Sequence, residues 1–257
     1  MKSYSQALKI LKKSKILFPD EYVKTSMCLN RVSAMDIFSK MDLPAANNSA
    51  FDGYAINSKD TKKLNSKNRK LFKVIGSIAA GTKPKKQKIK KFETLEIMTG
   101  GIIPNGFDAI VPKEKVDFHS TKKKTQFILI KEKILKNQNV RFKGSDFRKN
   151  ELLIKKGTIL NSNHILALKA LGINYLKVKK IPNILFFSTG NEITNQKKIP
   201  PWKVRNSNSH YIQSIDKNFL FNFKYAGNLN DKDEFLFKKK LNRFLNSKID
   251  IIITSGA

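Results

Sequence analysis

The chain has 257 residues, of which 40% are hydrophobic, and its formal net charge is +31. That length allows one large or two modest domains with a real core, and the hydrophobic fraction excludes a chain that is disordered throughout. The single cysteine, Cys28, excludes an intramolecular disulfide and a cysteine-based metal site.

The positive charge is spread along the chain, with denser spots at Lys83–Lys91 and Lys122–Lys124. A charge of this size attracts nucleic acid, membrane surfaces or small anions. Nucleic-acid binders usually concentrate it in a stripe or tail, so we interpret most lysines as solvated surface and rank nucleic-acid binding last. The sequence has no secretory signal and no apolar run of about 20 residues, which predicts a soluble, cytoplasmic protein without a membrane partner.

The N-terminal segment has the pattern of a helix that is followed by extended chain. Ser3 or Ser5 can cap this helix, its apolar residues fall roughly on one face, and Pro19 ends it. The stretch "RVSAMDIFSKMDLP" then alternates loosely between apolar and polar residues. It predicts a strand that enters a loop at Pro44.

The middle of the chain consists of short β-like runs. From about Leu71 to Lys133 they are separated by glycine and proline, which predicts a compact all-β or mixed unit. "ELLIKKGTIL" is a further candidate for a pair of strands. Ser162 or Asn163 can then cap a helix that runs through Leu171 and is followed by a strand.

The last part of the chain alternates strands with helices. The predicted strands are "NILFFSTGNE", "FKYAGNL" and "IDIIITSG", with one helix between each pair. This alternation predicts an incomplete doubly wound, parallel α/β domain, so the fold class is α/β multidomain with a β-rich inserted domain. Such domains bind ligands beyond the carboxyl ends of their strands. Because the last strand would leave a bare sheet edge, we expect either a sequence that is truncated at its C-terminus or a fold that something else completes.

Acids and hydroxyls recur where strands pass into loops: Asp52, Thr99, Asp146, Thr189, Glu192 and Asp231. Each has a plainer explanation, such as an Asp-Gly turn or an N-cap at Asp231 with Glu234 three residues later. Converging carboxylates among many lysines favour a divalent cation with oxygen ligands, Mg²⁺, and a phosphate-bearing substrate. Walker A, GxGxxG, HExxH and GxSxG motifs do not occur.

Taken together, six stretches resemble the molybdopterin molybdenumtransferase family, the type of MoeA and the gephyrin E domain. They follow one another in the family's order and cover nearly the entire chain. The stretches are "LPAANNSAFDGYAI", "IAAGT", "EIMTGGIIPNGFDAIVPKE", "RFKGSDFRKNELLIKKGTIL", "ALGINYLKVKKIPNILFFSTGNEI" and "IDIIITSGA". "NNSAFDGYA" and "MTGGIIPNGFDAIV" are the most specific of these motifs.

The resemblance implies an enzyme of molybdenum cofactor synthesis. It would insert molybdate into adenylated molybdopterin and release AMP, with Mg²⁺ as its cofactor. The implied catalytic residues are Asp52, Asp146, Glu192 and Asp231, of which Asp52, Glu192 and Asp231 would hold the metal. The implied substrate-binding residues are Thr99, Gly100, Ser188, Thr189, Gly190, Asn208, Ser255 and Gly256.

The family also implies a homodimer and a plan of three domains. Residues 1–27 and 150–181 would form an N-terminal linker and dimerisation domain, residues 28–149 the inserted β-rich domain, and residues 182–257 a partial molybdopterin-binding α/β domain.

Three positions depart from the family pattern. Asn191 and Asn206 stand where aspartate is usual, and Ala257 stands where a second glycine is expected. The family continues beyond this point with a further acid, two lysines and a small β-barrel domain. These departures leave open an alternative function, that of a truncated, non-catalytic interaction or scaffold member of the same fold.

Overall fold

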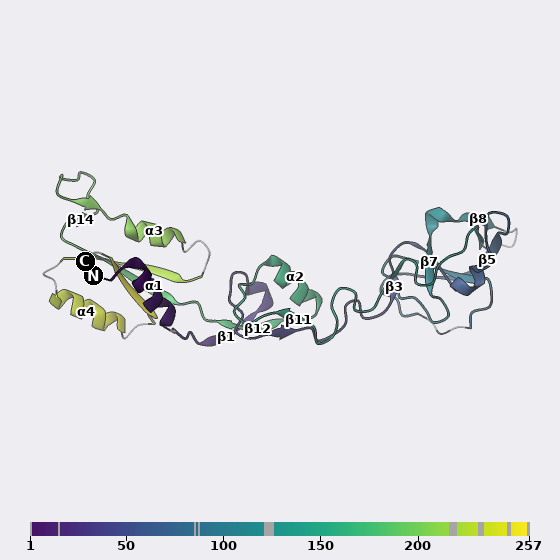
Figure 1. Cartoon of the computed structure of the whole chain (residues 1–257), viewed down its shortest axis with the longest axis horizontal. Coiled ribbons are helices and arrows are strands. Elements are labelled where there is room, and N and C mark those ends of the chain that lie inside the picture. The colour runs from purple at the N-terminus through teal and green to yellow at the C-terminus, as the bar shows by residue number, and fades with distance from the viewer. Residues whose placement is uncertain are drawn as a thin grey trace. The chain divides into compact units, whose positions relative to one another are not determined.

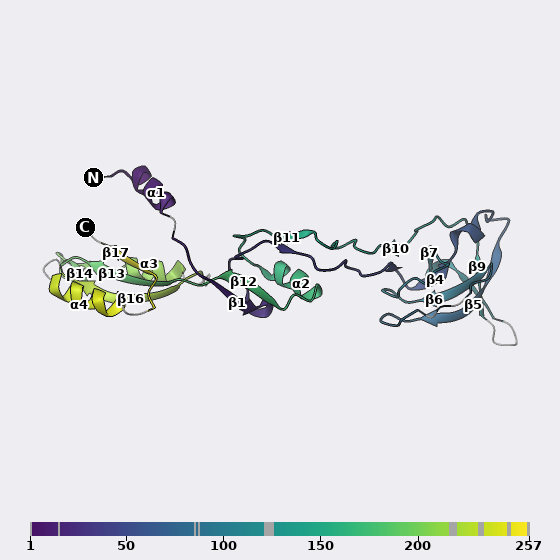
Figure 2. The same cartoon turned by 90° about the horizontal axis from the view of Figure 1, so that it is seen from below.

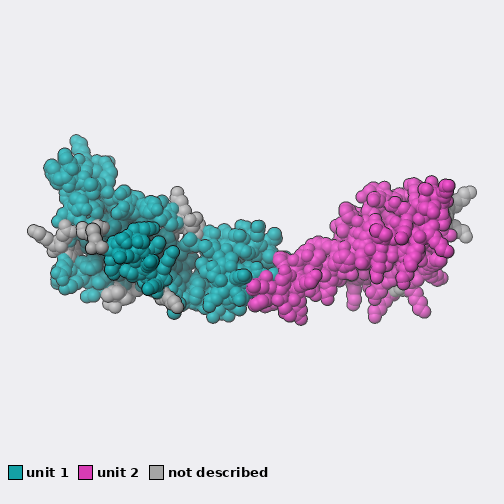
Figure 3. Space-filling model, viewed as in Figure 1, with its two compact units in different colours: residues 1–37, 153–257 teal, residues 38–152 magenta. Residues whose placement is uncertain are grey.

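The structure is a computed structural model, and its elements are shown in two views in Figure 1 and Figure 2. It describes residues 2–14, 16–84, 86, 88–120, 126–215, 220–230, 234–245 and 248–255. The chain divides into two compact units (Figure 3). Unit 1 comprises Met1–Ile37 and Leu153–Ala257, and unit 2 comprises Phe38–Leu152. The finer division into three domains stays a prediction.

Unit 2 is built around a six-stranded sheet with the order β7-β4-β6-β5-β9-β8. Neighbouring strands are antiparallel, except for the parallel pair of β5 and β6. The strands are β4 (Gly53–Ile56), β5 (Lys70–Ile78), β6 (Glu93–Ile97), β7 (Ala109–Pro112), β8 (Asp117–Ser120) and β9 (Gln126–Ile130). The predicted β-rich unit is confirmed, and the sheet also contains β4, which directly follows Asp52.

Short elements surround this sheet. They are β3 (Asn48–Ser49), which pairs with β10 (Val140–Arg141), and the 3-10 turns η2 (Ser58–Thr61) and η3 (Lys113–Lys115). The boundaries between the units fall in β2 (Ile37–Phe38) and β11 (Leu152–Ile154).

Two strand predictions near these boundaries are largely wrong. In "RVSAMDIFSKMDLP" only β2 is a strand, because the hydroxyls of Ser33 and Ser39 donate to the carbonyls of Met35 and Met41. Such local bonds compete with a sheet ladder. "ELLIKKGTIL" is not a pair of strands either. It contributes β11 alone, and its Ile159 forms an isolated bridge with Val32 instead.

The core of unit 2 fills both faces of the sheet. All four residues of β4 are buried, and Tyr54 packs with Phe72 and Val111 while Ala55 packs with Ile110 in a second cluster. Successive side chains of a strand point to opposite faces. The central strands are therefore covered on both sides.

Unit 1 begins with the predicted helix, α1 (Tyr4–Lys13), and Ser3 is confirmed as its N-cap, in a capping box with Gln6. The helix ends before Pro19. The next elements of this unit are β1 (Asp20–Lys24), η1 (Thr25–Met27), α2 (Ser162–Ala170) and β12 (Tyr175–Lys179), which pairs antiparallel with β1. The N-cap of α2 is Asn161, one residue before the earlier of the two predicted caps.

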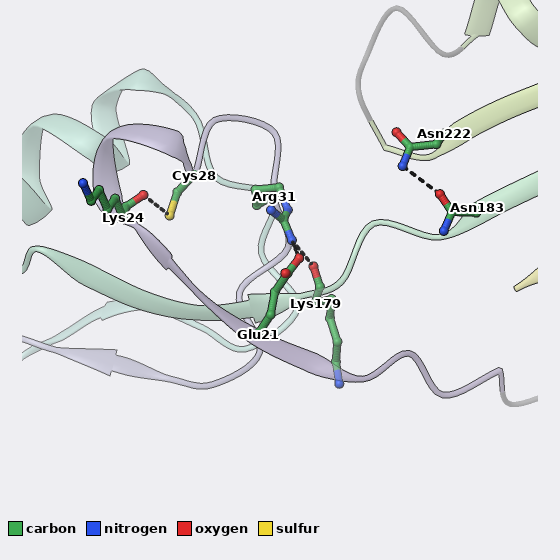
Figure 4. Close-up of polar contacts among 7 residues, drawn as sticks. All are labelled: Glu21, Lys24, Cys28, Arg31, Lys179, Asn183 and Asn222. Atoms are coloured by element: carbon green, nitrogen blue, oxygen red, sulfur yellow. Dashed lines mark hydrogen bonds and ion pairs between the residues drawn. The ribbon is translucent and has the colours of Figure 1, made fainter. Parts of the chain in front are cut away.

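The guanidinium of Arg31 ties the loop after β1 to the β1–β12 pair (Figure 4). It donates to the carboxylate of Glu21 and, at 2.8 Å, to the carbonyl of Lys179. In the same loop, the thiol of Cys28 donates to the carbonyl of Lys24 at 3.3 Å, and burial raises its pKa. Cys28 is completely buried, so it is a packing residue here.

The rest of unit 1 is the predicted α/β part. Three parallel strands lie in the order β16-β13-β17, with α3 and α4 on opposite sides of them (Figure 1). Phe237 and Phe244 of α4 pack on Leu185 and Phe187 of β13. The elements are β13 (Asn183–Thr189), β14 (Ile193–Thr194), β15 (Val204–Arg205), α3 (Asn208–Ile215), β16 (Asn222–Leu229), α4 (Glu234–Leu245) and β17 (Ile251–Ser255). Among the described residues, every helix is too short or too polar to traverse a bilayer.

The core of unit 2 generates a stability prediction for two adjacent residues of β5. Phe72 is fully buried, whereas Leu71 is 44% exposed. Phe72→Ala should lower the free energy of unfolding by about 3–5 kcal/mol, because it leaves a cavity in the buried cluster that contains Tyr54 and Ile128. Leu71→Ala should cost less than about 1 kcal/mol. Urea denaturation monitored by circular dichroism measures both, and equal losses would contradict this assignment of the core.

Candidate functional site

The backbone of unit 2 places Asp52 at the entrance to β4. A side chain at Gly53 would bring its Cβ to 2.1 Å from the carbonyl oxygen of Val111 in β7. Only glycine permits this approach of the two strands. The carbonyl of Asp52 in turn accepts from the backbone N–H of Lys113 at 3.0 Å. The position of Asp52 is therefore defined by the pairing of β4 with β7.

The Asp52 carboxylate is held by Thr99, a residue 47 positions further along the chain. Its Oδ1 accepts from both the backbone N–H and the Oγ1 hydroxyl of Thr99, each at 2.7 Å. These two bonds, the backbone one first, keep the pKa of Asp52 below its ordinary value, and the charge of Lys113 lowers it further. Oδ2 has no hydrogen-bond partner among the described residues. Asp52 therefore presents an ionised, exposed oxygen to a ligand.

Thr99 lies in the glycine-rich turn that follows β6. The N–H of Gly100 donates to the carbonyl of Ser49 at 2.9 Å, and the N–H of Gly101 donates to that of Met98 at 2.8 Å. Together with the N–H of Thr99, all three amides are used within unit 2. They hold Asp52 and the turn in place, and a role of Gly100 in substrate binding stays a prediction.

Asp146 lies elsewhere in unit 2. Its carboxylate pairs with Arg141 and accepts from the hydroxyl of Ser145 at 3.3 Å. It lines a cavity of about 550 Å³ together with Arg148 and Glu151. Within the part of the chain that the structure describes, no hydrogen bond or ion pair links Asp146 to Asp52. A catalytic role of Asp146 together with Asp52 stays a prediction.

The second candidate site is the carboxyl edge of the parallel sheet in unit 1. The hydroxyl of Thr189 donates to the carbonyl of Ser255 at 2.7 Å, and the N–H of Gly190 donates to that of Leu229 at 3.0 Å. Ser188 and Ser255 are partners in the register of β13 and β17. The predicted residues Ser188, Thr189, Gly190 and Ser255 thus lie together at the ends of three strands.

Glu192 folds back over this edge. Gly190 has a φ of +135°, and a Cβ added there would lie 2.5 Å from the Glu192 carboxylate. The carbonyl of Glu192 accepts from the N–H of Val204 at 2.9 Å, which ties it to β15. Its exposed carboxylate forms no ion pair within the described ranges. It is available to a ligand that approaches the edge.

Asn206 lies at this edge and was noted as a departure from the family pattern, but it was not among the site residues that the resemblance implies. It is only 6% exposed, its Oδ1 accepts from the Ser188 hydroxyl at 2.9 Å, and its Nδ2 is buried without a partner among the described residues. It lines a cavity of about 340 Å³ with Arg205 and His210. The signal in the sequence was a polar residue just before α3, whereas the predicted Asn208 is the exposed first residue of that helix.

The fit of these residues to Mg²⁺ rests on the donors they offer. Asp52 and Glu192 carry the hard carboxylate oxygens that Mg²⁺ prefers, in units 2 and 1 respectively. Within the described residues, no three His, Cys, Asp or Glu side chains gather into a metal-binding group. Two further predicted residues, Asp231 and Gly256, lie outside the described residues.

Comparisons with known proteins found a family model, curated relatives and solved structures that are similar to this chain. Residues 2–172 match the family described as MoeA N-terminal region (domain I and II). A molybdopterin molybdenumtransferase of Staphylococcus epidermidis is 29% identical over 99% of this chain and 59% of its own length. One of Staphylococcus aureus is 33% identical over 89% and 53%.

Two solved structures of molybdopterin biosynthesis MoeA protein from Pyrococcus horikoshii share the fold. One is 31% identical with a TM-score of 0.81 and the other 29% identical with a TM-score of 0.85. The match covers 98% and 99% of this chain, and 63% and 66% of theirs. The chain thus spans somewhat more than half of the length of its curated relatives. It belongs to the MoeA family of molybdopterin molybdenumtransferases.

Proposed function

We propose that this chain acts in molybdenum cofactor biosynthesis by inserting molybdate into adenylated molybdopterin, with release of AMP and dependence on Mg²⁺. The observation that carries the proposal is the geometry of Asp52, whose one oxygen is held by Thr99 while the other is open. Membership of the MoeA family and the names of the relatives support the choice of substrates. A homodimer in the cytoplasm is part of the same proposal.

In this proposal, Asp52 in unit 2 and Glu192 in unit 1 are each a candidate carboxylate ligand for Mg²⁺. Bound Mg²⁺ supplies positive charge that neutralises phosphate oxygens. Thr99 orients the Asp52 carboxylate through two hydrogen bonds, and both bonds favour its ionised form.

The carboxyl edge of unit 1 binds the organic substrate. Ligands of parallel α/β sheets lie beyond the carboxyl ends of the strands. There the buried Nδ2 of Asn206 is a hydrogen-bond donor without a partner among the described residues, and a substrate oxygen would satisfy it. Arg205 lines the same cavity and contributes positive charge toward a phosphate group.

The first prediction concerns the Asp52 carboxylate. Asp52→Asn keeps the shape of the side chain but removes its charge. Replacing a residue that only supports a metal ligand typically lowers activity by roughly 10–100-fold. Because Asp52 is proposed to be a ligand itself, the rate of AMP release should fall by more than that. The assay supplies adenylated molybdopterin, molybdate and Mg²⁺ to the purified protein. The matched control is Asp117→Asn, because Asp117 is an exposed carboxylate of the same unit that pairs with Lys131.

The control should retain the wild-type rate. A normal rate in Asp52→Asn would reject the site. A wild-type protein that binds adenylated molybdopterin without releasing AMP would instead favour the non-catalytic scaffold function.

The second prediction concerns Thr99 as a positioning residue. Thr99→Val removes the hydroxyl donor and keeps the backbone N–H, so the pKa of Asp52 should rise toward its ordinary value without reaching it. AMP release should fall about 10–100-fold. NMR titration of the Asp52 carboxyl carbon measures the pKa.

The control for this variant is Thr82→Val, which removes an exposed hydroxyl that donates to Ala79 in the same unit. It should leave the Asp52 titration unchanged. If Asp52 titrates alike in Thr99→Val and in the wild type, the hydroxyl does not contribute to holding the carboxylate.

A further inference from the structure

A second cavity of unit 1 lies at the end of the parallel sheet opposite to the carboxyl edge. It has a volume of about 650 Å³ and lies between the first residues of β13 and β16, the last turn of α4 and the turn before β17. We call it the amino-edge cavity, and the residues that matter for its chemistry are Asn183, Asn222, Lys224, Arg243, Phe244 and Lys248. It shares no lining residue with the cavity around Asn206.

The floor of the amino-edge cavity is a hydrogen-bonded frame centred on Asn183. Its Oδ1 accepts from Nδ2 of Asn222 at 2.9 Å (Figure 4), and its own Nδ2 donates to the carbonyl of Lys248 at 2.7 Å. The backbone N–H of Asn183 donates to the Asp250 carboxylate at 2.8 Å. These bonds join the starts of all three strands.

The side chains around this frame are strongly basic. Lys224, Arg243 and Lys248 line the cavity, and none of them forms an ion pair within the part of the chain that the structure describes. The described lining includes no carboxylate. The carbonyl end of α4 explains a basic residue in its last turn, such as Arg243. The end of α4 does not explain Lys224, because this residue comes from β16. Its Nζ lies 5.5 Å from the centre of the Phe244 ring.

We propose that the amino-edge cavity binds a phosphate-bearing small molecule. Its volume is in the range of small-molecule sites. Lys224, Arg243 and Lys248 outnumber the one carboxylate of the frame, Asp250, and supply charge-assisted hydrogen bonds to phosphate oxygens, while half-buried aromatic rings line the cavity beside them. This site is separate from the residues of the proposed molybdate insertion, so either can fail without the other.

The test is the binding of inorganic pyrophosphate to the full chain at a fixed salt concentration. The cavity variant is Lys224→Gln, Arg243→Gln and Lys248→Gln combined, and all three side chains are exposed. The matched control also removes three positive charges, but from exposed lysines of unit 2. Its substitutions are Lys62→Gln, Lys63→Gln and Lys67→Gln. Calorimetry gives the Kd, and NMR gives the backbone amide shifts of Asn183 and Asn222.

The cavity variant should bind pyrophosphate at least about tenfold more weakly, and the control less than about twofold more weakly. The amide signals of Asn183 and Asn222 should shift on titration of the wild type. Equal losses in both variants would show a general attraction by the basic chain, and shifts spread along the whole chain would do the same. Either result overturns the proposal.

Two further variants keep the test decisive. If the triple variant unfolds, the single variant Lys224→Gln replaces it in the test. It should still weaken pyrophosphate binding, by a smaller factor than the roughly tenfold loss expected of the triple variant. Arg205→Gln, at the carboxyl edge, should leave the pyrophosphate-induced shifts of Asn183 and Asn222 unchanged. Loss of those shifts in Arg205→Gln would assign the anion to the carboxyl edge and contradict the separate site.

Discussion

The site in unit 2 depends on the missing side chain at Gly53. Because this glycine packs against the Val111 carbonyl, β4 lies directly between β6 and β7, with Gly53 opposite Ile97 on one side and Pro112 on the other. The residues just before β4 and just after β6 therefore meet. That register brings Thr99 to Asp52, and the functional geometry is a direct consequence of how the central strands pair.

The partners of Asp52 distinguish it from Asp20 and Asp117, two other acids of this lysine-rich chain. The pKa values of Asp20 and Asp117 are lowered first by lysine side chains, so their charge is already balanced. The pKa of Asp52 is lowered first by two uncharged donors of Thr99. Lys113, whose charge also lowers the pKa of Asp52, forms its ion pair with Glu96 at 3.1 Å. Asp52 thus keeps a negative charge that the protein itself does not neutralise, which suits a residue that binds a cationic ligand.

The sequence predicts much of the α/β part because β13 and β17 contain apolar runs and α4 has an apolar face. It fails where polar groups act locally. The serines at 33 and 39 break a predicted strand through bonds to their own neighbours. The strand β4 was not predicted, because the Asp-Gly pair at its start is typical of a turn. The motifs around Asp52 and Thr99 were both recognised, but the hydrogen bonds that join these two residues were not predicted. The role of Asn206 depends on a buried bond to Ser188, which no local pattern encodes.

The pairing of β1 with β12 has a consequence for how the chain folds as it leaves the ribosome. Unit 2 is contiguous in sequence, so all of its strands can pair once residue 152 has emerged. Strand β1 must wait for Tyr175–Lys179, about 150 residues after it, which takes roughly 8–30 s at ordinary rates of translation. During that interval the early residues of unit 1 are exposed without their partner strand. Chaperones that bind nascent chains can bind these residues until β12 has been synthesised.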